Sequence, residues 1–155
     1  MIMTRRTLLL TGIAFGLLQG VPAIAQGLPP VHVVKDAACP CCNAWIGHLR
    51  DNAFPVTFEE RSIESLELYK REKGIPADLA SCHTGTVEGY VLEGHVPAAD
   101  IRRLLKERPK AVGLAVPGMP YGSPGMGPET ERAAYDVLLI GTDGTSSTFT
   151  RYAAA

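Results

Sequence analysis

A short strand-like segment followed at once by clustered cysteines constrains the fold of this chain more than any other feature. Residues 31–36 have the apolar character of a buried strand. Three of the four cysteines follow directly: Cys39, Cys41 and Cys42. Pro40 suits the first position of a helix, because the N–H group that proline lacks would have had no partner there. The pattern therefore predicts a strand, a turn and a helix over 40–51.

The helix start gives the cysteines different environments. We expect Cys39 to be the N-cap, where the positive end of the helix dipole favours its thiolate. Cys42 begins an i, i+3, i+4, i+7 pattern with Trp45, Ile46 and Leu49, so it should face the core. A packed core gains nothing from three cysteines in four residues, although single cysteines are often simply buried. The cluster indicates disulfide exchange or binding of a soft metal.

The first 25 residues have the pattern of an export signal. Arg5 and Arg6 precede an apolar run, and a small-residue cleavage site ends at Ala25. The paired arginines also fit a twin-arginine signal, so both export routes stay open. The run is too short for a confident membrane span. We expect one exported domain over residues 26–155.

The rest of the chain predicts an α/β domain in which a central mixed sheet is flanked by helices. Its 15 basic residues, two of them in the leader, against 16 acidic ones give no basic excess for nucleic acid. Helices are expected from Ser62 to Lys73 and over 98–108. Further strands are expected over 54–59, 87–92, 111–116, 135–140 and 147–152, the last two as a hairpin. The order of elements is typical of a thioredoxin-like fold, with a cis bond before Pro120 facing the cysteines.

Two further stretches carry candidate ligands. The segment 117–128 holds four prolines and four glycines, together with Met119 and Met126. Thioether sulfur on such a loop is a soft ligand that suits Cu(I), although packing over the core is an alternative. Cys82 and His83 would add a thiolate and an imidazole if their segment folds back on the cysteine helix. His95 is a weaker candidate, and we expect His32 and His48 to be structural or solvated.

Several motifs together resemble the periplasmic CopG-type copper-resistance proteins over roughly residues 31–150. They are the Cys-Pro-Cys-Cys segment with Trp45, Ser81–Thr84, Glu93–Pro97, Gly113–Pro120 and Gly122–Met126. The resemblance implies a thioredoxin-like fold that holds copper through thiolates. One form of such a site is a cluster of several copper ions bridged by the thiolates. The resemblance also implies sulfur ligands at Cys39, Cys41, Cys42 and Cys82, with His83, Met119 and Met126 as supporting groups.

Two functions follow from these residues. The first is a periplasmic protein that binds Cu(I) in copper resistance, alone or with other periplasmic copper-handling proteins, and is not an enzyme. The second is a thiol–disulfide oxidoreductase in which Cys39 attacks and Cys42 resolves. A third thiol at Cys41 and the paired methionines have no role in that enzyme, so they favour copper. Zinc is a weaker alternative, because it prefers four separated ligands.

Overall fold

The fold is built on one mixed sheet of seven strands, seen in a computed structural model that describes residues 27–155. The expected leader therefore lies outside the described residues. The strands are β1 (Val31–Lys35), β2 (Val56–Glu60), β3 (His83–Val87), β4 (Tyr90–Glu93), β5 (Ala111–Ala115), β6 (Tyr135–Gly141) and β7 (Ser146–Tyr152). Their order across the sheet is β2-β1-β3-β4-β5-β6-β7. The pairs β1/β2 and β4/β5 are parallel, and the other neighbours are antiparallel.

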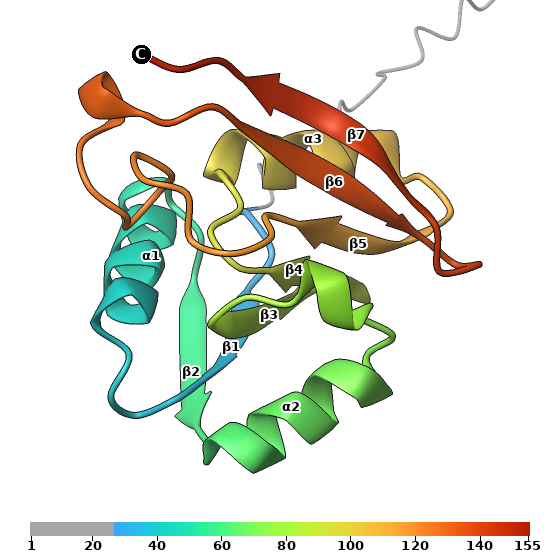
Figure 1. Cartoon of the computed structure of the whole chain (residues 1–155). Helices are drawn as coiled ribbons and strands as arrows, with labels where there is room; N and C mark the ends of the chain where they lie inside the picture. Colours follow the sequence, from blue (N-terminus) through green and yellow to red (C-terminus); the bar gives the residue numbers. More distant parts are fainter. Residues whose placement is uncertain (1–26) are drawn as a thin grey trace, which may run out of the picture.

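Three helices flank the sheet: α1 (Pro40–Asp51), α2 (Ile63–Glu72) and α3 (Ala98–Glu107). Short 3-10 turns occur at Ala77–Leu79 and Glu129–Glu131. The inner faces of α1 and α3 share one apolar core on one side of the sheet. Its buried members include Val33, Trp45, Leu49, Leu92 and Ile101. Helix α2 packs on the opposite side, and Figure 1 shows the terminal β6–β7 hairpin at the far end of the sheet from β2.

The sequence predicted much of this arrangement. Helix α1 has the predicted bounds and buries Cys42, Trp45, Ile46 and Leu49. Ser62 caps α2 by accepting a hydrogen bond from the Ser65 N–H. The single mixed-sheet α/β domain is confirmed, and its strand order is compatible with a thioredoxin-like arrangement. No helix within residues 27–155 combines the length and the apolar character needed to cross a membrane.

Two expectations were wrong. The single strand expected over 87–92 is a hairpin of β3 and β4, because Glu88 and Gly89 adopt positive φ angles and reverse the chain. The expected cis bond before Pro120 is absent, since every peptide bond within residues 27–155 is trans. The segment that precedes the β3–β4 hairpin and faces the cysteines contains Cys82, not a proline.

Candidate metal centre

The N-terminus of α1 presents three cysteines in two states. Cys39 is the N-cap and Pro40 occupies the first turn, as predicted. A disulfide joins Cys39 to Cys42, the one local pair whose spacing suits a bond, with their Cα atoms 5.4 Å apart. Within the described residues, Cys41 and Cys82 are free thiols, and both are half-buried. The helix start therefore combines a disulfide with a neighbouring free thiol.

Cys82 brings a fourth sulfur from a distant part of the chain. It directly precedes β3, and its Sγ lies 3.7 Å from the Sγ of Cys41. The Sγ of Cys41 lies 3.5 Å from that of Cys39. All four cysteine sulfurs lie within 4.8 Å of one another. We call Cys39, Cys41, Cys42 and Cys82 the sulfur quartet, and thiolates gathered in this way suit Cu(I) or another soft ion.

Two buried imidazoles adjoin the quartet through Cys82. The Cys82 Sγ lies 3.2 Å from His83 Nδ1 and 3.3 Å from His95 Nε2. The Nδ1 of His95 is 2.8 Å from the carbonyl oxygen of Pro124. A donated Nδ1–H fixes the ring and leaves a lone pair on Nε2, which is the arrangement of a metal-binding histidine. His95, which the sequence reasoning ranked below His83, is thus the better oriented of the two.

Burial determines the protonation of these groups. Desolvation, reinforced by the neighbouring Cys41, raises the pKa of the Cys82 thiol to about 12. Desolvation also lowers the pKa of both His83 and His95, and for His83 the nearby His95 and Lys70 add to the effect. At neutral pH the site therefore has neutral imidazoles and a protonated Cys82 that must lose its proton before it binds a metal.

A buried ion pair holds the Cys82 segment in place. The Glu93 carboxylate accepts hydrogen bonds from the Lys70 ammonium at 2.5 Å and the Ser81 backbone N–H at 2.6 Å. The Thr84 hydroxyl donates to the same carboxylate and accepts from Lys70. Burial raises the pKa of Glu93, and the Lys70 ammonium opposes that rise. The pair thereby links α2, β4 and the residue before Cys82.

The glycine- and proline-rich loop packs against the same region. The Ser81 hydroxyl donates to the Gly118 carbonyl at 2.5 Å, and Pro124 holds His95 as described above. The structure therefore brings the loop backbone to the site. The two predicted thioether ligands, Met119 and Met126, are residues of this loop. Met119 is 54% exposed and Met126 is half-buried. Figure 1 shows this loop, in orange, beside α1.

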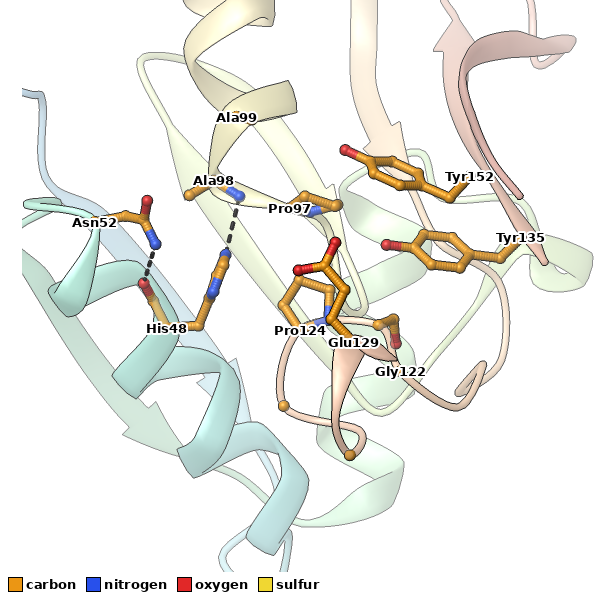
Figure 2. Close-up of a pocket in the computed structure, with 13 residues that line it drawn as sticks. His48, Asn52, Pro97, Ala98, Ala99, Gly122, Pro124, Glu129, Tyr135 and Tyr152 are labelled. Atoms are coloured by element: carbon orange, nitrogen blue, oxygen red, sulfur yellow. Dashed lines mark hydrogen bonds between the residues drawn. The ribbon is translucent and has the colours of Figure 1, made fainter. Parts of the chain in front are cut away.

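A cavity of about 480 Å³ lies between the loop, the C-terminal half of α1, the start of α3 and the β6–β7 hairpin. Figure 2 shows His48 on one of its walls and the rings of Tyr135 and Tyr152 on another. The two rings stack with their centroids 4.8 Å apart. The Nε2 of His48 accepts the Ala98 backbone N–H at the start of α3, which is the structural role expected for this histidine. The cavity contains no group of metal-ligating side chains among the described residues.

Replacing Gly125 with alanine should displace the loop from α1. A Cβ at Gly125 would lie 2.8 Å from the Trp45 backbone nitrogen, and its φ of +85° disfavours any other residue. We expect a loss of about 2 to 4 kcal/mol in the free energy of unfolding, from overpacking and backbone strain together. Urea unfolding measures it. Gly144→Ala is the matched control, because its φ is +82° but its Cβ meets nothing within 4 Å. Equal losses in both variants would show that the loop does not press on α1.

Two kinds of comparison with known proteins find matches for this chain. A family model described as a protein of unknown function, DUF411, matches residues 79–126. The solved structure of copper resistance protein CopG in form 1 is 43% identical, with a TM-score of 0.76 over 82% of this chain and 99% of that chain. Its form 2 is also 43% identical, with a TM-score of 0.75 over 81% and 98%. No curated protein matches the chain.

Proposed function

This chain belongs to the family of the CopG copper resistance proteins, and from that premise we propose that it binds copper(I) through the sulfur quartet. The observation that carries the proposal is the convergence of the four sulfurs within 4.8 Å from segments about forty residues apart. Thiolate is a soft ligand that suits Cu(I), and membership of a copper-resistance family favours copper over zinc at these sulfurs. His95 and His83 adjoin the quartet, and Met119 and Met126 supply thioethers on the neighbouring loop.

The bound copper would be the cargo of a resistance system. An export signal over residues 1–25, cleaved after Ala25, would take the protein to the periplasm by either export route. Copper in that compartment comes from outside the cell or from other periplasmic copper-handling proteins. The half-buried positions of Cys39, Cys41 and Cys82 support exchange of the ion with such partners, because these residues are not closed off in the core.

Reduction of the Cys39–Cys42 disulfide precedes full loading. A disulfide sulfur carries no thiolate charge, so the oxidised quartet offers only Cys41 and Cys82 as thiolate ligands. Two electrons and two protons convert the disulfide into two thiols, and a periplasmic dithiol reductant is the class of donor that can supply them. Copper loading is therefore expected to follow the redox state of this pair.

A thiol–disulfide oxidoreductase is the second candidate, and the Cys39–Cys42 disulfide at the helix start favours it. One experiment separates the two functions. The purified, reduced chain is titrated anaerobically with Cu(I) against a coloured chelator, and a disulfide-reductase assay runs beside it. Several coppers per chain with negligible turnover support copper binding. Turnover that survives Cys41→Ser, in a protein that retains no copper, supports the enzyme.

Copper affinity should rise steeply with pH. The pKa of Cys82 is about 12, so its thiol is protonated throughout the range from pH 6 to pH 8. Binding of Cu(I) must displace that proton, and the affinity should therefore rise at least about tenfold per pH unit. Competition titrations corrected for the chelator's own protonation measure the slope. In Cys82→Ser the slope should fall by about one proton, and an affinity that does not change with pH would contradict this assignment.

A further inference from the structure

Cys82 belongs to two groups of potential ligands that respond differently to oxidation. The first is the sulfur quartet, half of which is removed by the Cys39–Cys42 disulfide. The second consists of Cys82, His83 and His95, whose ligand atoms also lie within 4.8 Å of one another. We call these three residues the mixed triad. No atom of the triad takes part in the disulfide, so the triad is intact in the oxidised protein described here.

The distances in the mixed triad are close to those of a filled site. The Cys82 Sγ lies 3.2 Å from His83 Nδ1 and 3.3 Å from His95 Nε2. Metal–ligand bonds of roughly 2.0 to 2.3 Å place two ligands of one ion about 3.3 to 3.8 Å apart. A small outward movement of the Cys82 side chain would therefore admit one ion between the three atoms.

The surroundings of the two rings fix their orientation. Pro124 accepts the hydrogen bond from His95 Nδ1, which directs Nε2 toward Cys82. The ring of His83 packs against Trp45 with centroids 4.4 Å apart and meets His95 edge-on at 5.0 Å. His83 is fully buried, and its Nε2 has no hydrogen-bond partner within the described residues. With the ring proton on Nε2, Nδ1 carries the lone pair that faces Cys82 and is the ligand atom of this residue.

We propose that the disulfide form of the protein keeps one copper(I) ion on the mixed triad, while the reduced form holds several on the quartet. The inference rests on the proposed function for the identity of the ion. It adds that oxidation of Cys39 and Cys42 lowers the copper content without emptying the protein. One ion with two nitrogen ligands and one sulfur ligand would mark this state.

The test compares two redox states of the same chain. Alkylation and mass spectrometry first establish that the oxidised sample has two free thiols, Cys41 and Cys82. Anaerobic Cu(I) titration is then expected to give one ion per oxidised chain. Copper X-ray absorption of that sample should show both nitrogen and sulfur neighbours. This measurement uses the unsubstituted chain, so it does not depend on whether any variant folds.

Substitutions assign the ion to its ligands. In the oxidised state, Cys82→Ser should abolish copper retention and His95→Gln should weaken it at least tenfold. Cys41→Ser should still retain one ion, because Cys41 is outside the triad. His32→Gln is the matched control, since His32 lies on β1 with its Nδ1 2.9 Å from the Thr57 hydroxyl and should have no effect.

The outcomes separate this inference from the proposed function. An oxidised protein that holds no copper would overturn the inference, and so would loss of the ion in Cys41→Ser or a copper environment of sulfur alone. In each of those cases several coppers in the reduced protein would leave the proposed function intact. Failure of the reduced protein to bind any copper through Cys41 and Cys82 would instead refute the quartet as a copper site.

Discussion

Replacement of Cys82 with serine is expected to lower the Cu(I) affinity of the reduced protein by about a hundredfold, or about 2.7 kcal/mol. Cys82 is the one sulfur of the quartet that lies outside the start of α1, and it adjoins Cys41 at 3.7 Å. Among the four sulfurs of the quartet it is also the one that contacts both imidazoles. Serine has the same shape but a harder oxygen, which is a poor ligand for a soft ion.

Competition titration against a Cu(I) chelator measures this loss, and urea unfolding of the metal-free variant is its control. We expect the free energy of unfolding without copper to change little, because the Cys82 side chain is half-buried and makes no disulfide in this structure. Wild-type affinity in a folded Cys82→Ser protein would show that α1 alone binds the copper.

The second large effect is expected at the buried ion pair behind the site. Glu93→Gln would leave the Lys70 ammonium buried without its carboxylate, and such a loss costs about 3 to 5 kcal/mol. The Ser81 N–H would also lose its charged acceptor, so the Cys82 segment should become mobile and bind copper more weakly. Urea unfolding measures the first effect and Cu(I) competition the second.

Two further variants show whether the cost comes from the unpaired charge. Glu107→Gln removes a carboxylate from the exposed Arg103–Glu107 pair and should change stability by no more than about 0.5 kcal/mol. The double variant Lys70→Met with Glu93→Leu removes both charges and should be more stable than Glu93→Gln. If Glu93→Gln costs no more than the Glu107 control, the pair does not secure the segment.

Local patterns were sufficient to predict the helix that carries the cysteines. Proline at its first turn and the spacing of Cys42, Trp45 and Leu49 determine its start and its buried face. They also predicted that Cys39 and Cys42 are the local pair able to form a disulfide. These features depend on residues within one or two helical turns, which is the range over which sequence periodicity is informative.

The sequence made His95 only a weaker candidate, because the β3–β4 hairpin was not recognised. The Glu88–Gly89 turn sets a register in which Thr84 pairs with Glu93. Continuing that register by two residues places Cys82 opposite His95. A two-residue turn at Glu88–Gly89 was therefore the signal in the sequence that could have brought the two together.

The position of the glycine- and proline-rich loop could not be predicted from local sequence patterns. The loop has no periodicity, and its place is set by contacts with distant residues, such as Gly125 on the backbone of α1 and Gly118 on the Ser81 hydroxyl. The thioredoxin-like order of elements predicted a cis bond before Pro120. Every peptide bond within residues 27–155 is trans, and the segment that faces the cysteines is the one before β3. Such long-range packing is not encoded in a short window of sequence.

The most direct test of the account is the location of the copper itself. Crystals of the reduced, Cu(I)-loaded protein, with anomalous diffraction recorded at the copper edge, would give its position. The account predicts copper peaks bonded to the Sγ atoms of both Cys41 and Cys82, which belong to segments far apart in the chain. Copper bound at sites that exclude Cys82, or no copper between these sulfurs, would contradict it.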